Sequence, residues 1–171
     1  SCIMKNLILG LFILGLTSPV FSQVVEGGTL GEVDLTAVNY KYLAAAGTQN
    51  AALPVGYLQK QVAQYDLKES EFYTDDYESY KVTFYIPDGQ IVAAYDKDGN
   101  VLRTIEKYKD IALPKPVLDA IAKQYPKWSI YKDVYGITYH QNTGAKKTYK
   151  VTLLNKDKKI HVKLDENGNF I

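Results

Sequence analysis

The chain has 171 residues, of which 46% are hydrophobic and 23% charged, a composition typical of a folded globular protein and not of a disordered one. Lys and Arg number 20 and Asp and Glu 19, so the chain lacks the basic excess of a general nucleic-acid binder, and we expect no nucleic-acid partner. Cys2 is the single cysteine, which excludes an internal disulfide.

The first 22 residues have the order of a secretory signal peptide. Lys5 is followed by an apolar run at residues 7–16 and then by small and polar residues. The run is too short to cross a bilayer of roughly 30 Å at about 1.5 Å per residue. We therefore expect residues 1–22 to be cleaved, leaving a periplasmic or secreted protein with no membrane span.

Met4 is interpreted as the initiator, with residues 1–3 as an upstream start or a remnant of cloning. Cys2 is then lost with the signal peptide, and the product from Gln23 contains no cysteine. This excludes cysteine catalysis and thiolate metal sites, and it fits a bacterial periplasm better than a disulfide-stapled secreted domain.

Residues 23–52 form the next expected segment, an N-terminal extension with one extra strand. The stretch at 24–31 is glycine-rich, and residues 33–43 are rich in β-formers, which predicts the extra strand. We expect this strand to pair with the sheet near the short acidic stretch at 67–79.

Two motifs indicate an internal duplication. The sequence YKVT at 80–83 returns at 149–152, 69 positions later. At the same shift, DKDGN at 96–100 returns as DENGN at 165–169. Each copy of this second motif follows an alternating apolar stretch.

A Leu-Pro pair begins each copy, at Leu53 and again at Leu113, a shift of 60. The second copy thus carries nine more residues before its YKVT sequence. These matches predict a first repeat at 53–108 and a second at 109–171.

Each copy is predicted to begin with a helix and continue as antiparallel strands. Proline suits the first turn of a helix, and apolar residues recur at helical spacing after Pro54 and Pro114. Period-two alternation then predicts strands at 80–86, 91–95, 101–105, 128–139, 149–153 and 160–164. One sheet face is apolar and must be covered, so we expect an α+β fold in which two helices pack on one face of an antiparallel sheet.

The DKDGN sequence has two interpretations, a calcium loop or a turn between strands. Asp96 at the start of a turn can accept hydrogen bonds from amides two residues on, and Gly99 supplies a positive φ. Calcium needs six to eight oxygen ligands, whereas no further acid follows until Glu106. The turn is the favoured interpretation, and we expect no metal or other cofactor.

The two Leu-Pro helix starts, Trp128, the YKVT strands and the paired Asp-x-x-Gly-Asn turns resemble the PepSY-like proteins exported by Bacteroidetes, which are related in fold to the beta-lactamase inhibitory protein. The resemblance covers residue 53 to the end of the sequence. It implies tandem helix-and-sheet units arranged as in the beta-lactamase inhibitory protein (BLIP), that is, a BLIP-like fold. It also implies a protein-binding role in which an exposed sheet face contacts a peptidase or an envelope enzyme. Its motifs are structural, so they bear on fold more than on activity.

Strand parity places a mixed tyrosine, threonine and basic set on the face away from the core, and this set, together with Tyr131 and Tyr135 of the strand at 128–139, is the candidate binding face. Its residues are Lys81, Thr83, Tyr85, Arg103, Tyr131, Tyr135, Lys150, Thr152, His161 and Lys163. The alternative is that exposed strands commonly carry Thr, Tyr and Lys because these are good β-formers. Tyr131, Tyr135 and Tyr139, spaced by four, either form an aromatic stripe or pack under the second helix.

No catalytic constellation is apparent. His140 and His161 lack partner ligands at metal spacing, and the acidic stretch at 69–78 is interpreted as a solvated loop. The leading hypothesis is a non-enzymatic exported binding module, with a self-associating structural or envelope-stress protein as the alternative. A small hydrolase is the least favoured.

Overall fold

The computed structural model describes residues 39–171, so the expected signal peptide and the stretch at 23–38 lie outside the described residues. Within residues 39–171, the helices and strands follow in this order: α1 (Tyr40–Ala46), the short 3-10 helix η1 (Thr48–Asn50), α2 (Leu53–Gln64), β1 (Ser79–Ile86), β2 (Gly89–Asp96), β3 (Val101–Lys109), α3 (Lys115–Gln124), β4 (Ser129–His140), β5 (Gly144–Asn155) and β6 (Lys158–Asp165).

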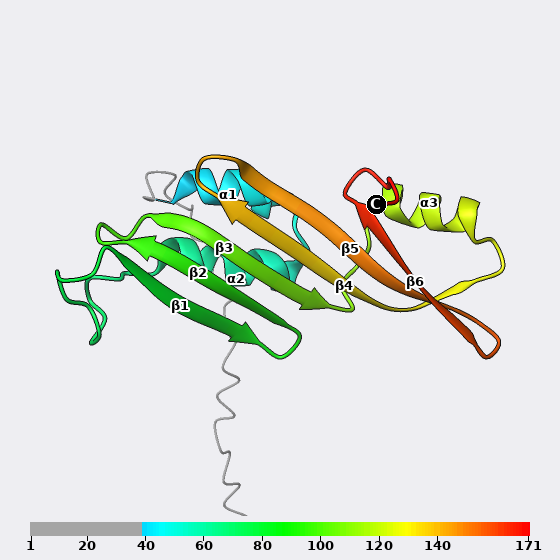
Figure 1. Ribbon diagram of the computed structural model, residues 1–171, viewed down its shortest axis with the longest axis horizontal. Helices are drawn as coiled ribbons and strands as arrows, with labels where there is room; N and C mark the ends of the chain where they lie inside the picture. Colours follow the sequence, from blue (N-terminus) through cyan, green and yellow to red (C-terminus); the bar gives the residue numbers. More distant parts are fainter. Residues whose placement is uncertain (1–38) are drawn as a thin grey trace, which may run out of the picture. The chain divides into compact units, whose positions relative to one another are not determined.

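The six strands form one antiparallel sheet whose spatial order is the chain order, β1 to β6 (Figure 1). Hairpins join every pair of neighbours except β3 and β4, between which the chain runs through α3. Helices α1 and α2 contact each other and the same sheet, α2 against β1 and β2 and α1 against β4 and β5. The predicted α+β class and antiparallel sheet are confirmed.

Alternation of side chains along the strands builds the core on the helix-facing side. Tyr80, Tyr95 and Tyr149 are buried there, as parity predicts. The apolar stripe of α2, with Leu58 and Val62 fully buried, covers these strands. Burying this stripe is favourable by about 1.5–3 kcal/mol for each large aliphatic side chain.

Helix α3 joins the same core from the second half of the chain. Its Val117 and Ile121, four positions apart, are buried and belong to the cluster that includes Leu153 of β5 and Leu164 of β6. Both predicted helices therefore form, and each begins with proline in its first turn. No helix within residues 39–171 is long and apolar enough to cross a membrane.

The strand predicted at 33–43 is wrong where the structure describes it. Asn39 lies in a turn and residues 40–43 begin α1, which buries Tyr42 and Ala46 four positions apart. β-Forming residue types were outweighed here by the run of alanines at 44–46 and by burial at helical spacing. Residues 67–78 contain no strand, so β1 is an edge of the sheet as described.

The DKDGN and DENGN sequences form two turns of the same geometry, and the turn interpretation is confirmed. Oδ1 of Asp96 accepts hydrogen bonds of 2.9 Å from the amides of Asp98 and Asn100, and its Oδ2 accepts one of 2.8 Å from Asn100 Nδ2. Asp165 accepts the corresponding three bonds, each of 2.9 Å, and the turn glycines share a φ of 84°. The carboxylate oxygens of each aspartate thus accept hydrogen bonds from their own loop, and these bonds account for the turn geometry.

Candidate protein-binding face

The sheet has a second side, opposite α1 and α2, that the described residues leave uncovered. Its positions alternate with the core residues along every strand, and most of them are exposed. We call this side the basic face, because every charged side chain in the interior of its strands is a cation or a histidine. Its Lys and Arg residues, all exposed, are Lys81, Arg103, Lys107, Lys109, Lys132, Lys146, Lys150, Lys159 and Lys163.

Strand register places these cations next to one another across the sheet. Lys150 of β5 pairs directly with Lys163 of β6. Val134 of β4 separates Lys150 from Lys109 of β3. Like charges in directly opposed positions weaken a sheet, so this arrangement does not serve stability.

Carboxylates are nearly absent from the same side. Asp96 and Asp165 occupy outward positions, but each ends its strand and turns its oxygens to its own loop. Within residues 39–171, the ion pairs involve Lys68, Lys115 and Lys147, none of which lies on the basic face. The cations of the face are therefore not neutralised by the part of the chain that the structure describes.

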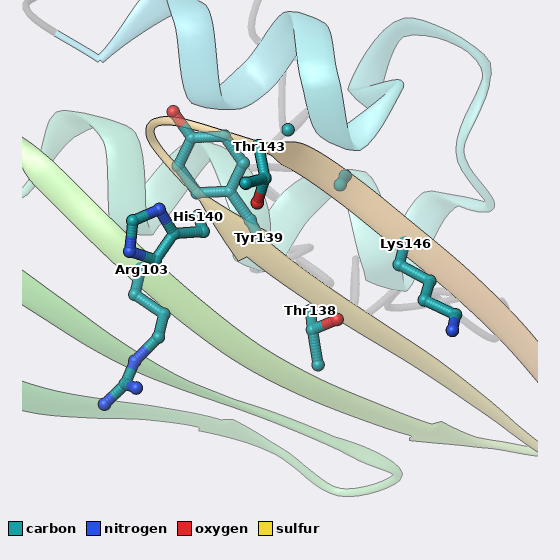
Figure 2. Close-up of a pocket in the computed structure, with 8 residues that line it drawn as sticks. Arg103, Thr138, Tyr139, His140, Thr143 and Lys146 are labelled. Atoms are coloured by element: carbon teal, nitrogen blue, oxygen red, sulfur yellow. The ribbon is translucent and has the colours of Figure 1, made fainter.

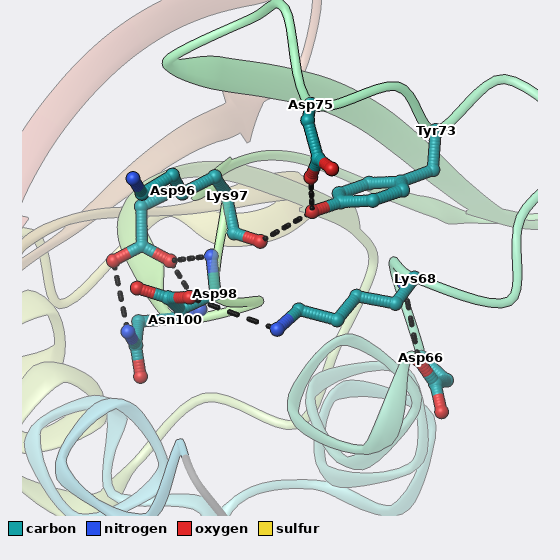
Figure 3. A network of polar contacts seen from close by, with 8 residues as sticks. All are labelled: Asp66, Lys68, Tyr73, Asp75, Asp96, Lys97, Asp98 and Asn100. Atoms are coloured by element: carbon teal, nitrogen blue, oxygen red, sulfur yellow. Dashed lines mark hydrogen bonds and ion pairs between the residues drawn. The ribbon is translucent and has the colours of Figure 1, made fainter.

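The balancing acids gather in an irregular exposed segment at residues 66–78, just before β1. Its carboxylates are Asp66, Glu69, Glu71, Asp75, Asp76 and Glu78. Figure 3 shows how this segment is tied to the first turn: the Tyr73 hydroxyl donates to Asp75 Oδ1 at 2.8 Å and lies 3.2 Å from the carbonyl oxygen of Lys97, and Lys68 Nζ lies 3.6 Å from Asp98 Oδ1. A nearly neutral chain thus carries strongly segregated charge.

Exposed apolar side chains are interspersed with the cations. Ile105, in the middle of β3, is 53% exposed and pairs with the half-buried Val92 of β2. Tyr85 at the β1 edge is 71% exposed. An isoleucine and a tyrosine this open on a regular strand suit contact with another protein surface.

Two shallow depressions border the face. One, of about 400 Å³, lies at the β4–β5 hairpin and includes Arg103, Thr138, His140 and Lys146. Figure 2 shows Arg103, Thr138 and Lys146 extending to one side of the sheet, while Tyr139 extends toward the helices. The other, of about 240 Å³, lies where the β1–β2 hairpin meets β3 and includes Tyr85, Lys107 and Lys109. Both depressions are open, and cationic side chains outnumber acidic ones in their linings, where Asp88 of the second depression is the one carboxylate.

Most of the residues selected from the sequence are brought together on this side of the sheet. Those at its outward positions and accessible are Lys81, Thr83, Tyr85, Arg103, Lys150, His161 and Lys163. Thr152 also points outward by register but is buried, and its Oγ1 lies 3.0 Å from His161 Nδ1. Thr152 is therefore a support for His161 and not a contact residue.

Tyr135 is a correction, because it lies on the helix-facing side. It is 6% exposed and stacks between Tyr108 and Tyr149, at centroid distances of 6.1 and 4.6 Å. A register shift in β4 between Ile130 and Lys132 breaks the expected spacing-by-four stripe. Tyr131, at this irregularity, is exposed, with Lys159 Nζ 4.5 Å from its ring centre.

The buried polar cluster around Glu106 was not predicted. This carboxylate is 2% exposed and accepts four hydrogen bonds of 2.8 to 3.0 Å, from Tyr42, Gln59, Thr104 and Tyr108. Burial raises the pKa of Glu106, and the four donors oppose that rise. The one signal of this cluster in the sequence was the period-two spacing of Thr104, Glu106 and Tyr108, which puts them on one side of the strand. The spacing does not show which side of the strand is buried.

The side chains of the Glu106 cluster are all buried and shielded from solvent. Burial and the neighbouring Glu106 charge raise the pKa of Tyr42 well above its ordinary value, so its hydroxyl remains a donor. No group of three or more His, Cys, Asp or Glu side chains within residues 39–171 is placed to hold a metal ion.

Comparison with known proteins gives little further information. No protein-family model and no curated protein sequence matches the chain. Among solved structures, it is similar to the crystal structure of a BLIP-like protein from Bacteroides fragilis, with 21% identity, a TM-score of 0.33, and coverage of 57% of this chain and 68% of that chain. A similarity at this level says nothing about a partner.

Proposed function

We propose that this protein is an exported, non-enzymatic binding module whose basic face contacts a protein partner, a peptidase or another envelope enzyme that it inhibits or regulates. The two halves, 53–108 and 109–171, are interpreted as tandem PepSY-like repeats that together supply one continuous face. Equal geometry in the Asp96 and Asp165 turns supports that interpretation.

One observation carries the proposal: within residues 39–171, a six-stranded sheet is covered by helices on one side and open on the other, and the open side exposes Tyr85 and Ile105 among cations that have no ion-pair partner in that part of the chain. A stable antiparallel sheet needs only one covered side, so openness alone has no functional meaning. The exposed apolar side chains give the open side a functional meaning, because protein interfaces combine an apolar centre with a charged rim.

The test is affinity capture with the whole chain from periplasmic and surface fractions of the producing organism, followed by mass spectrometry and by measurement of the affinity for the captured protein. Tyr85→Ala combined with Ile105→Ala should weaken that affinity at least about tenfold, since apolar anchors at an interface centre commonly contribute more than about 1 kcal/mol each.

The matched control is Tyr57→Ala combined with Leu118→Ala, a tyrosine and an aliphatic residue that are also exposed but lie on α2 and α3. This pair should leave the affinity unchanged. Equal affinity of the two double variants would remove the basic face from consideration as the interface.

The second candidate, a self-associating structural or envelope-stress protein, is favoured by the charge segregation within one chain. The acidic segment at 66–78 of one copy could contact the basic face of another. Sedimentation velocity would then show oligomers that grow with protein concentration and dissociate in high salt. A monomer at all concentrations in low salt would exclude this candidate.

A further inference from the structure

We propose that the partner's contact surface is acidic, with carboxylates placed beside apolar side chains, and that a four-lysine cluster on the basic face selects it. The cluster consists of Lys109, Lys132, Lys150 and Lys163. This inference rests on the proposed function and names the chemistry of the partner.

The four lysines of the cluster lie close together on the sheet. Lys109, Lys150 and Lys163 lie in one row across β3, β5 and β6, with Val134 of β4 between the first two. Lys132 lies two positions from Val134 on the same side of β4. With strands about 4.8 Å apart and about 6.7 Å between alternate residues, the four lysines start from backbone positions within roughly 15 Å of one another.

Charge complementarity favours an acidic occupant. The four lysines are exposed, and the ion pairs within residues 39–171 include none of them. Their mutual repulsion costs stability in the free protein and is relieved when carboxylates are placed between them. Because screening at physiological salt acts over about 8 Å, the lysines attract an acidic surface locally although the whole chain is nearly neutral.

The neighbouring side chains favour a protein over a nucleic acid. Nucleic-acid faces stack bases on adjacent aromatic rings, whereas Tyr85 and Tyr131 lie on separate strands, and Lys159 already occupies the region over the Tyr131 ring. Ile105 and Val92 instead place aliphatic surface next to Lys107 and Arg103. Such an apolar strip bordered by cations fits a protein surface that pairs apolar and acidic groups.

The experiment uses defined probes with the full chain. These are a random copolymer of glutamate and tyrosine, polyglutamate of equal length, a single-stranded DNA oligonucleotide, and vesicles containing an anionic phospholipid. The glutamate–tyrosine copolymer should bind most tightly, and raising the salt from about 50 to about 200 mM should weaken its binding.

The matched variants neutralise three lysines each. Lys109→Gln, Lys150→Gln and Lys163→Gln together should weaken copolymer binding about tenfold, which corresponds to about 1.4 kcal/mol, or nearly 0.5 kcal/mol for each of three solvent-facing charge contacts. The control, Lys97→Gln, Lys123→Gln and Lys127→Gln, changes exposed lysines away from the face and should leave binding unchanged. Melting curves check that both variants are folded.

Three results would overturn the inference: polyglutamate, DNA or vesicles binding as tightly as the copolymer, an equal loss in both triple variants, or no binding of the copolymer. Binding of the captured partner to the same variants distinguishes failure of this inference from failure of the proposed function. If the Tyr85/Ile105 variant loses that partner while the Lys109/Lys150/Lys163 variant retains it, the acidic surface is wrong and the binding face stands. If both variants retain it fully, the face is not the interface and both proposals fail.

Discussion

The Tyr42 hydroxyl donates a 2.8 Å hydrogen bond to Oε1 of Glu106, joining α1 to the middle of β3 across 64 residues of sequence. Gln59 of α2 donates to the other oxygen at 2.9 Å, so a single buried carboxylate holds both helices to the sheet. A charge buried without a cation is tolerated only when donors satisfy it, and here four of them do.

Replacing Tyr42 with Phe removes one donor and keeps the ring that packs against Tyr139 at 5.2 Å. The free energy of unfolding should fall by about 2 kcal/mol, the usual contribution of a hydrogen bond to a charged group. Urea unfolding monitored by circular dichroism measures this loss. Tyr85→Phe is the control, because its hydroxyl is on an exposed side chain and the change should stay within about 0.5 kcal/mol. Equal effects of the two substitutions would mean that the Glu106 cluster does not anchor α1.

Asp133 should give stability a measurable pH dependence. Burial raises its pKa from 3.8 to about 6. A carboxyl whose pKa is raised by folding binds its proton more tightly in the folded state, so its contribution is present below the unfolded pKa and is lost as pH rises through the folded one. The window here is about pH 4 to 6.

Asp133→Asn removes this titration but keeps an oxygen near the Ile111 amide, which lies 3.4 Å from Asp133 Oδ1. The free energy of unfolding of the variant, relative to the wild type, should therefore rise between about pH 4 and pH 6 and level off above. Because both proteins contain the same histidines, any contribution of the histidines to the pH dependence cancels in this difference. A difference that stays constant over this range would show that Asp133 keeps its ordinary pKa.

The two turns offer a comparison in which the backbone is the same and the surroundings differ. Gly99 and Gly168 both have a φ of 84°, where a side chain is strained. A Cβ at position 99 would meet nothing within 4 Å, whereas a Cβ at position 168 would lie 2.4 Å from the Pro116 carbonyl oxygen. Gly99→Ala should cost about 1 kcal/mol, and Gly168→Ala more, by at least about another 1 kcal/mol, because α3 must move away. Denaturant unfolding of both variants tests the order, and equal costs would contradict the close packing of α3 on the second turn.

Calcium should not stabilise the first turn. Both carboxylate oxygens of Asp96 already accept hydrogen bonds from Asp98 and Asn100, and a cation would have to displace them. The melting temperature in millimolar calcium should equal that in chelator, for the wild type and for Asp96→Ala alike. A calcium-dependent rise that disappears in Asp96→Ala would restore the metal-loop interpretation.

Local patterns in the sequence were sufficient for the elements whose periodicity is regular. Alternation along β1 correctly places Tyr80 inside and Tyr85 outside, and proline at the first turn locates α2 and α3. Each of these signals depends on neighbouring residues alone, which is why it can be read without a structure.

The remaining features depend on distant contacts. Residues 40–43 have the composition of a strand, yet Tyr42 is held in a helix with its hydroxyl on Glu106, 64 residues away. The sequence selected part of the basic face by strand parity, but the near-zero total charge hides the separation of its lysines from the acids at 66–78, which appears only when the strands are aligned. No composition measure reports which side of a sheet a lysine occupies.

The irregularity in β4 gives the sharpest contrast between two tyrosines that are four positions apart. A regular strand would place Tyr131 and Tyr135 on the same side, but the register shift after Ile130 leaves Tyr131 55% exposed and Tyr135 6% exposed. Tyr135→Ala should lower the free energy of unfolding by about 3 to 5 kcal/mol, because it empties the space between the Tyr108 and Tyr149 rings. Tyr131→Ala should change it by less than about 0.5 kcal/mol, since it removes an exposed ring and one solvent-facing contact with Lys159. Chemical denaturation of the two variants side by side makes the comparison. Small losses for both would mean that Tyr135 belongs to the binding face after all, whereas large losses for both would mean that β4 runs straight and buries Tyr131 as well.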